Sequence, residues 1–287
     1  MILKNVNALI TGGSQGLGKA IAEQFLRAGA NVAICARAEK ELIATRAELA
    51  RQFPAHKILA RPCDVSDEAE VSALADFVLH ELGSLQALVL NAGVYGPMGP
   101  TESVDFAEWK HAVEINLFGV LLPCRAFIPH FKQAGRGKII ALSGGGATNP
   151  LPNISAYAAS KAAVTRLVET LAEELKLFNV DVNAIAPGAL ATRLMDEVLA
   201  AGPEKVGSTF YEKNRGWKQK GATPLELGAR LAVYLAGPQS DGISGKLISA
   251  QWDPWEKLHE FKADLKNDIY TLRRIVPKDR EKNWGGK

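Results

Sequence analysis

Short apolar runs alternate with longer stretches of helical periodicity along most of this chain, and that alternation limits the folds it can adopt. Each apolar run has the length of a buried strand, and each helical stretch is long enough to carry the chain back across a sheet. The expected strands are 7–10, 31–36, 57–60, 85–90, 138–142, 180–186 and 246–249. This rhythm predicts an α/β fold, a doubly wound parallel sheet with helices on both faces.

The segments between these strands carry the signals of helix ends. Asp67 and Gly83, for example, stand where an N-cap and a C-cap are expected. The expected helices are 17–28, 39–53, 67–82, 106–133 with a bend near Pro123, 157–178, 193–200 and 224–236. The rest of segment 188–222 reads as irregular. We therefore expect one domain over residues 1–250 and a C-terminal extension over 251–287.

The composition excludes several classes of function. With 34 Lys and Arg against 31 Asp and Glu, the net charge of +3 is too small to predict a nucleic-acid surface. No apolar run marks a membrane span, and the start of the chain lacks the apolar core of a signal peptide. Cys35, Cys63 and Cys124 are widely spaced, so neither a disulfide framework nor a metal site is expected. Together these features predict a cytoplasmic protein.

A glycine-rich loop, Thr11-Gly-Gly-Ser-Gln-Gly-Leu-Gly18, stands between the first strand and the first helix. A helix N-terminus presents free backbone N–H groups to a phosphate, and side chains on the loop would keep the phosphate away. Gly12 permits the tight turn, Gly16 the close approach of the ligand, and Gly18 the close packing of helix on strand. The loop predicts a dinucleotide site; the alternative is a turn that only needs positive φ.

Further motifs follow the loop in a fixed order. They are Asp64-Val65, Asn91-Ala92-Gly93, Asn116, Tyr157-x-x-x-Lys161, and Pro187-Gly188 with Thr192. With Gly-x-x-x-Gly-x-Gly in front of them, the chain resembles the short-chain dehydrogenase/reductase family over about residues 1–250. The resemblance implies a Rossmann-type fold and direct hydride transfer between a nicotinamide cofactor and a small-molecule carbonyl or secondary alcohol. It also implies a homodimer or homotetramer, with helices 106–133 and 155–178 at an interface.

The resemblance assigns cofactor contacts residue by residue. They are Gly12, Ser14, Gln15, Gly16, Leu17 and Gly18 in the loop, then Arg37, Asp64, Val65, Asn91, Ala92, Gly93, Tyr157, Lys161, Pro187, Gly188 and Thr192. In the family pattern, Asp64 and Val65 border the adenine. Asn91 holds the loop beside the adenosine ribose, and Thr192 bonds the nicotinamide carboxamide.

Arg37 bears on which nicotinamide cofactor binds. NAD is normally held by an acidic residue at the end of the second strand, which repels an added phosphate. Here that position is Ala36, followed by Arg37, whose guanidinium suits a phosphate. The sequence therefore predicts NADP rather than NAD. Against this, Gln15 stands where many NADP-binding relatives carry a second basic residue, and the alternative for Arg37 is a solvated surface position.

Tyr157 and Lys161 stand four residues apart, so they share one face of the expected helix. A phenol has a pKa near 10 in water, and a neighbouring ammonium lowers that pKa by about 1–3 units. The resemblance makes Tyr157 the general acid/base and Lys161 a ligand of the nicotinamide ribose. Asn116 is expected to bend its helix and to anchor a water in a proton relay to Lys161. The alternative for Asn116 is a buried amide that bonds a backbone carbonyl.

A serine that bonds the substrate oxygen precedes the tyrosine in this family, and Gly144 occupies the usual place for it here. Ser143 comes one residue earlier. Because the glycine-rich loop after Ser143 can absorb one extra residue, Ser143 is the expected hydroxyl donor. A backbone N–H of a loop glycine, or Thr148, is the alternative.

Several functions fit this pattern. Ketoreductases of 3-oxoacyl thioesters, as in 3-oxoacyl-[acyl-carrier-protein] reductases, are the most similar activity. A non-catalytic NADP-binding redox sensor and a sugar or steroid alcohol dehydrogenase using NAD are the alternatives. Isomerases and dehydratases that retain their cofactor usually carry a different glycine spacing. Substrate contacts are expected from loops 95–100, 144–154 and 188–217, at the carboxyl ends of the strands.

The extension opens with Asp253-Pro254-Trp255-Glu256, which combines an N-cap residue with a proline at the first helical position. Apolar residues then recur every three or four positions: Trp255, Leu258, Phe261, Leu265, Ile269, Leu272 and Val276. The pattern predicts an amphipathic helix over 254–275, stopped by Pro277. Either this helix only completes the fold, or it shapes the pocket and brings a basic end to an acidic group of the substrate.

Overall fold

Seven parallel strands form one sheet in the order β3-β2-β1-β4-β5-β6-β7, in a computed structural model that describes residues 1–284. The strands are β1 (Asn7–Thr11), β2 (Asn31–Ala36), β3 (Ile58–Pro62), β4 (Ala87–Leu90), β5 (Gly137–Leu142), β6 (Val180–Ala186) and β7 (Leu247–Ser249). All seven expected strands are present, with ends within two residues of the prediction. The predicted doubly wound α/β fold is confirmed.

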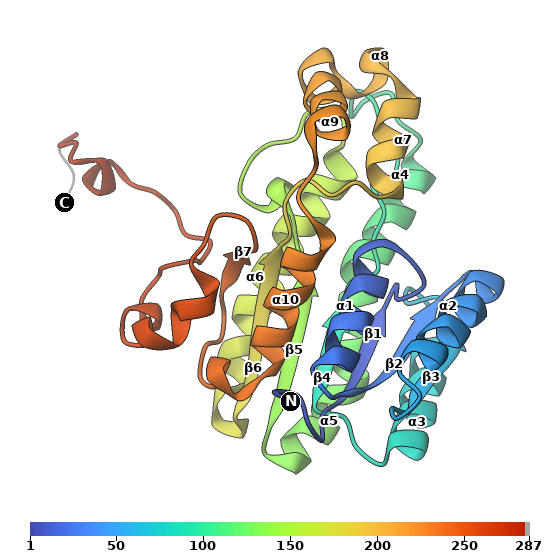
Figure 1. Cartoon of the computed structure of the whole chain (residues 1–287). Coiled ribbons are helices and arrows are strands. Elements are labelled where there is room, and N and C mark those ends of the chain that lie inside the picture. The colour runs from blue at the N-terminus through green and yellow to red at the C-terminus, as the bar shows by residue number, and fades with distance from the viewer. Residues whose placement is uncertain (285–287) are drawn as a thin grey trace.

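Helices cover both faces of the sheet (Figure 1). One layer holds α1 (Gly16–Arg27), α2 (Glu39–Gln52) and α10 (Leu225–Ala236); the other holds α3 (Glu68–Leu82), α5 (Gly119–Ala134) and α6 (Ser155–Leu175). Strand side chains alternate between the two layers, so Ala8 and Ile10 pack on the first and Leu9 on the second. Burial on both sides explains why the strands read as continuous apolar runs.

The long helical stretch after β4 is interrupted, though not at Pro123. It consists of α4 (Phe106–Val113), a π-helical turn at Glu114–Phe118, and α5. Pro123 lies inside α5. By length and composition alone, Phe106–Ala134 could span a bilayer. The core helix of a soluble protein also meets these criteria, and here Val120, Phe127 and other residues are buried against the sheet.

The segment after β6 is more helical than predicted. It forms α7 (Arg193–Ala201), α8 (Pro203–Val206) and α9 (Ser208–Lys220). Only the first was expected. The sequence of α9 is polar on nearly every side, with Asn214 as its buried residue, so it carries no apolar periodicity to reveal it.

The predicted helix over 254–275 is wrong. The extension forms short 3₁₀ turns at Trp255–Phe261, Asp264–Lys266 and Pro277–Arg280. The buried Lys246 donates from Nζ to the carbonyls of Asn267 and Ile269, at 2.7 and 2.9 Å. These carbonyls accept hydrogen bonds from Lys246 and not from the N–H groups of a helix. Tyr270 also has a positive φ of 61°, which would end a helix there.

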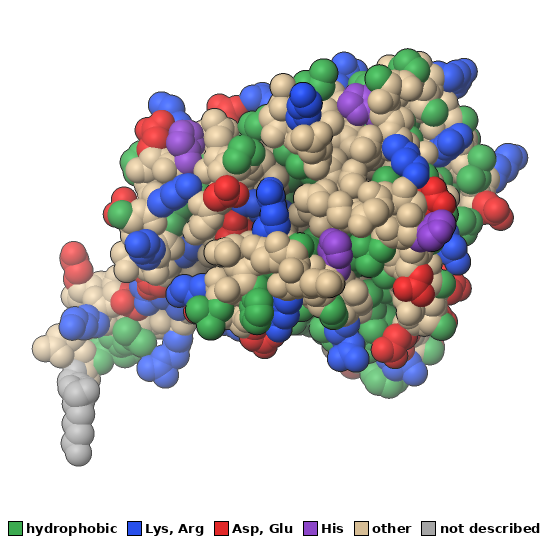
Figure 2. Space-filling view, turned by 90° about the horizontal axis from the view of Figure 1, so that it is seen from below, with side chains coloured by type: hydrophobic (Ala, Val, Ile, Leu, Met, Phe, Trp, Pro, Cys, Tyr) green, Lys and Arg blue, Asp and Glu red, His purple; other side chains and the backbone are tan. Residues whose placement is uncertain are grey.

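Part of the apolar pattern in the extension nevertheless marks residues that are buried in the core. Trp255, Leu258 and Leu265 are buried in the layer of α10, whereas Phe261 and Ile269 are each 45% exposed. The end of the extension projects from the body in both views (Figures 1 and 2). Residues 285–287 of the predicted extension lie outside the described residues.

Candidate active site

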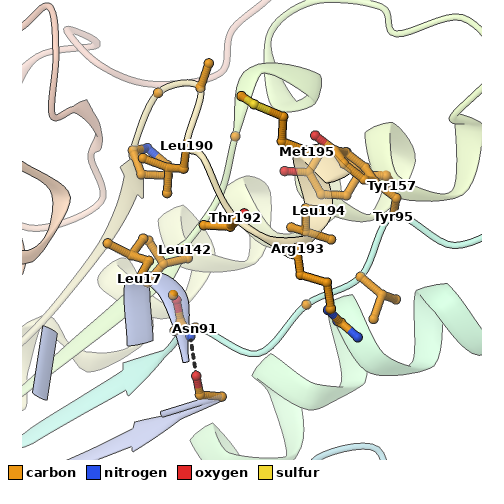
Figure 3. Close-up of a pocket in the computed structure, with 18 of the residues that line it drawn as sticks. Leu17, Asn91, Tyr95, Leu142, Tyr157, Leu190, Thr192, Arg193, Leu194 and Met195 are labelled. Carbon is orange, nitrogen blue, oxygen red and sulfur yellow. Dashed lines mark hydrogen bonds between the residues drawn. The ribbon is translucent and has the colours of Figure 1, made fainter. Parts of the chain in front are cut away.

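A cleft of about 1490 Å³ opens at the carboxyl ends of the strands (Figure 3). It lies where β1 and β4 are neighbours, because the chain continues from β1 to β2 on one side and from β4 to β5 on the other. Such a switch in strand order leaves a crevice for a ligand. Every predicted cofactor residue lines the cleft except Gly18, and every predicted catalytic residue lines it except Asn116. The two residues outside the lining lie directly behind it, as their contacts below show.

The glycine loop has the geometry of a phosphate cradle. Gly12 and Gly16 have φ values of +62° and +54°, which favour glycine. A Cβ on Gly18 would lie 2.1 Å from the Gly12 carbonyl oxygen, so Gly18 permits the helix to pack on the loop. Gln15, at the N-cap of α1, forms no side-chain cap. The first amides of this twelve-residue helix are thus available to an anion, and the loop fits the pyrophosphate of a dinucleotide.

Asn91 holds this loop in place from the neighbouring strand. Its Nδ2 donates to the carbonyls of Thr11 and Gly12, both at 3.0 Å. In return, Thr11 Oγ1 accepts the amides of Asn91 and Ala92 at 3.0 and 3.1 Å. Asn91 therefore contacts the loop as the sequence pattern implied, while its own side chain remains on the wall of the cleft (Figure 3).

The opposite wall comes from the loop after β6. Pro187 and Gly188 follow the strand, Gly188 with a φ of +91°. Thr192 is the N-cap residue of α7, and a Cβ on Gly16 would lie 3.4 Å from Thr192 Cγ2. The glycine loop and the Thr192 loop thus face each other at close range.

Arg37 and Asp64 form the far end of the cleft. Their charged groups are 3.8 Å apart, and the Arg37 side chain is 50% exposed. Burial raises the pKa of Asp64, but the hydrogen bonds from Ser66 and the charge of Arg37 outweigh it and hold that pKa below its usual value. Arg37 has free donors for an anion, because a single contact at 3.8 Å does not occupy its guanidinium fork.

Tyr157 and Lys161 lie one turn apart on α6, at the wall of the cleft. Lys161 Nζ donates to the Leu142 carbonyl at 2.7 Å and lies 5.7 Å from the centre of the Tyr157 ring. Burial lowers the pKa of Lys161 to about 8. Burial, together with the charge of Tyr95, raises the pKa of Tyr157 above its usual range. The expected lowering by Lys161 is absent, because its ammonium bonds a carbonyl and burial dominates.

Asn116 lies in the π-helical turn and is fully buried. Its Oδ1 accepts the Val94 amide at 2.9 Å, and its Nδ2 donates to the Val94 carbonyl at 2.8 Å and to Ser160 Oγ at 3.0 Å. Asn116 thus interrupts its helix and bonds a backbone carbonyl, which combines the two interpretations of this residue. A water relay through it stays a prediction.

Ser143 does not face the Tyr157 hydroxyl. Its Oγ lies 2.9 Å from Thr165 Oγ1 and donates to the Lys161 carbonyl at 3.3 Å, both on α6, and the residue is buried. Instead, a Cβ on Gly144 would lie 2.6 Å from Tyr157 Oη. These contacts argue against the expectation that Ser143 is the donor. The loop absorbs no extra residue, so Gly144 keeps the serine's place and Ser143 points into the layer of α6.

Comparisons with known proteins agree with this geometry. Residues 6–202 match the family model described as short chain dehydrogenase. The chain belongs to the short-chain dehydrogenase family. It is therefore an oxidoreductase of the family that acts on CH–OH groups with a nicotinamide cofactor.

Two curated relatives of this short-chain dehydrogenase have similar identity. Levodione reductase of Leifsonia aquatica is 32% identical over 236 residues, which cover 81% of this chain and 88% of the relative. The 7alpha-hydroxysteroid dehydrogenase of Escherichia coli K12 is 33% identical over 251 residues, covering 84% and 91%.

Two solved structures are also similar. An NADH complex of 3-ketoacyl-(acyl-carrier-protein) reductase from Brucella melitensis has a TM-score of 0.75 and 31% identity, covering 86% of this chain and 97% of that one. An NADPH-bound short-chain oxidoreductase from Pseudomonas aeruginosa PAO1, described as containing an atypical catalytic center, has a TM-score of 0.77 and 29% identity, covering 88% and 98%.

Beyond the motif residues, this short-chain dehydrogenase has an aromatic wall beside Tyr157. The Tyr95 ring packs edge-on to the Tyr157 ring with centres 4.7 Å apart, and Phe210 of α9 packs edge-on to Tyr95 at 6.5 Å. Tyr95 and Phe210 fall in loops expected to contact substrate, but no spacing singled them out. Trp252 of the extension also lines the cleft.

Proposed function

We propose that this chain is an NADP-dependent oxidoreductase that interconverts a ketone and a secondary alcohol, with Tyr157 as the general acid/base. One observation carries the proposal: a single cleft is lined by the glycine loop at the start of α1 and by the Tyr157–Lys161 pair on α6. A nucleotide-binding regulator would need the first of these features and not the second.

The residues present fit a dinucleotide. The open N-terminus of α1 and the glycine loop would hold its pyrophosphate, and Thr192 its carboxamide. When bound, the cofactor supplies or accepts a hydride at the substrate carbon. Tyr157 keeps its proton at neutral pH, because its pKa is raised, and donates that proton to the carbonyl oxygen in reduction. This leaves Tyr157 as a phenolate, which the nearby Lys161 ammonium stabilises. In oxidation the Tyr157 phenolate takes the proton from the alcohol and becomes the neutral phenol again.

NADP preference rests on the end of β2. Ala36 offers no carboxylate that would repel a 2′-phosphate, and Arg37 follows it with a half-exposed guanidinium. Similar structures contain NADPH in one case and NADH in another, so the preference is inferred from these two residues alone.

We infer that the substrate is a ketone with an apolar body. Tyr95, Phe210 and Trp217 line the substrate part of the cleft, and such rings favour a hydrophobic partner. The names of the relatives above, levodione reductase and 7alpha-hydroxysteroid dehydrogenase, point to cyclic ketones and alcohols. A 3-oxoacyl thioester is the second candidate, and the 3-ketoacyl reductase structure supports it.

We also infer a homodimer or homotetramer in the cytoplasm. The helices that the family resemblance places at an interface expose two large aromatic side chains, Phe106 at 74% and Phe118 at 43%. Aromatic residues are enriched at protein interfaces, which supports this inference.

NADPH oxidation with a panel of cyclic ketones and 3-oxoacyl thioesters tests the function, with product mass as the readout. We expect turnover by the parent protein and a loss of at least about 10³-fold in Tyr157→Phe, which keeps the ring but removes the proton. Unchanged NADPH affinity in that variant is the control for folding. NADPH binding without turnover on any ketone would instead support the sensor.

A further inference from the structure

Preorganised hydrogen-bond donors stabilise the charge that develops on the reacting oxygen, and Ser143 is not placed to be a donor beside Tyr157. Its Oγ is engaged by Thr165 and by the Lys161 carbonyl. The residue that does face the Tyr157 hydroxyl is Gly144, which has no side chain to offer. A Cβ there would already lie within 2.6 Å of Tyr157 Oη, so the phenol occupies the room that a hydroxyl side chain would take.

A second hydroxyl side chain, that of Tyr95, packs beside Tyr157. Tyr95 follows β4 by a few residues and lines the same cleft. Its ring packs edge-on to Tyr157, with an interplanar angle of 60° and centres 4.7 Å apart. Figure 3 shows both rings with their hydroxyl ends turned toward the same part of the cleft, near α7.

The position of Tyr95 is fixed by the backbone that carries it. Val94, the preceding residue, is held by both groups of the Asn116 side chain at 2.9 and 2.8 Å. Phe210 packs edge-on against the Tyr95 ring, with centres 6.5 Å apart. A donor held in this way needs little reorganisation when the substrate arrives.

Tyr95 also keeps its proton. Burial, and after it the charge of Glu197, raise the pKa of Tyr95 to about 12. At neutral pH its hydroxyl is therefore a hydrogen-bond donor and not a phenolate that would repel charge on the substrate oxygen.

We propose that Tyr95 is a second catalytic hydroxyl, which donates a hydrogen bond to the substrate oxygen beside Tyr157. The proposal rests on the proposed function. In reduction, Tyr157 transfers its proton to the oxygen, while Tyr95 holds the same oxygen and keeps its own proton. Ser143 is then a structural residue that ties β5 to α6.

Tyr95→Phe tests this, because it removes one oxygen atom and keeps the ring that packs against Tyr157 and Phe210. Loss of one preorganised donor commonly costs about 10²–10³-fold in kcat. We expect a fall of about 10²-fold in kcat, with KM for the ketone and the Kd for NADPH changed by less than about threefold. A residue that only forms the wall would instead change KM.

Two further variants sharpen the comparison. Ser143→Ala is expected to change kcat by less than about threefold while lowering the melting temperature, since it removes a buried hydrogen bond. Tyr211→Phe on α9 makes the same chemical change at a tyrosine outside the cleft lining, and its kinetics should match the parent.

The proposal is overturned if Tyr95→Phe keeps kcat within about threefold of the parent, or if Ser143→Ala loses more than about tenfold while still binding NADPH. Either result in a parent that reduces ketones, with Tyr157→Phe inactive, removes only the role of Tyr95. A parent with no ketone turnover would instead remove the proposed function.

Discussion

Asn116 and Val94 are joined by two hydrogen bonds, as two strand residues would be: the Val94 amide donates to Asn116 Oδ1 at 2.9 Å, and Asn116 Nδ2 donates to the Val94 carbonyl at 2.8 Å. The same Nδ2 donates to Ser160 Oγ, which in turn donates to the Tyr157 carbonyl at 2.8 Å. One amide therefore links the backbone before Tyr95 to the helix of Tyr157.

Asn116→Asp should be strongly destabilising for this reason. A carboxylate cannot donate to the Val94 carbonyl or to Ser160, and it would be a buried charge without a cationic partner among these contacts. We expect a loss of about 3–5 kcal/mol in the free energy of unfolding, measured with urea. Asn116→Ala, which introduces no charge, is the comparison and should cost less. A fall in kcat at unchanged stability would show that the water relay, and not this link, is the main role.

Lys161 predicts a specific dependence of stability on pH. Its pKa is lowered to about 8 by burial, whereas the unfolded chain has the ordinary value near 10.4. Between these values the unfolded state binds more protons, so stability rises with pH across this window. Below about pH 8 the folded protein bears the full cost of the buried ammonium.

Lys161→Met isolates this effect. We expect the variant to gain stability relative to the parent at pH 7 and to lose that advantage progressively toward pH 10. Urea unfolding of both proteins without cofactor, at several pH values, measures the difference and cancels the other groups. The raised pKa of Tyr157 acts on both proteins above pH 10, outside this window. A difference that does not vary with pH would contradict the lowered pKa.

The end of β2 predicts how cofactor preference can be changed. Ala36→Asp combined with Arg37→Ala places a carboxylate where the added phosphate would lie and removes its cationic partner. We expect the ratio of kcat/KM for NADPH to that for NADH to fall by about 10²-fold. Arg37→Lys keeps the charge without the planar fork, so the same kcat/KM ratio should fall by less in this variant. A ratio that is unchanged in the double variant would mean that Arg37 only pairs with Asp64 at the surface.

The sequence predicted most of what is set locally, because buried strands and capped helices carry their own patterns. The strands, the glycine loop and the Tyr157–Lys161 pair follow from such patterns. The direction of Ser143 could not be predicted in this way, because its Oγ contacts Thr165 Oγ1 and the Lys161 carbonyl of α6, which are distant in sequence. Its role as the donor stays a prediction, which these contacts argue against. Tyr95 could not be singled out, since its proposed role depends on a contact with Tyr157 across 62 positions of sequence.

The extension shows the limit of periodicity as a signal. Its apolar spacing predicted one helix, but long-range bonds from Lys246 hold the chain at Asn267 and Ile269 in another path. Trp255 shows which part matters: it is buried against Tyr234, and its Nε1 donates to the Ala250 carbonyl at 3.0 Å. The projecting end makes no contribution to the cleft among the described residues, whose lining stops at Trp252.

Two truncations should therefore behave differently. Ending the chain after Arg274 removes the projecting basic end and should leave the melting temperature within about 2 °C and KM for the ketone unchanged. Ending it after Ala250 removes Trp255, Leu258 and Leu265 from the core and Trp252 from the cleft, and should abolish folding or lower stability by several kcal/mol. Trp255→Ala in the full chain, with an expected cost of about 3–5 kcal/mol, separates the packing from the loss of the cleft residue. If ending the chain after Arg274 is enough to raise KM for the ketone, the basic end does meet an acidic group of the substrate. The extension then has the functional role that its sequence first suggested.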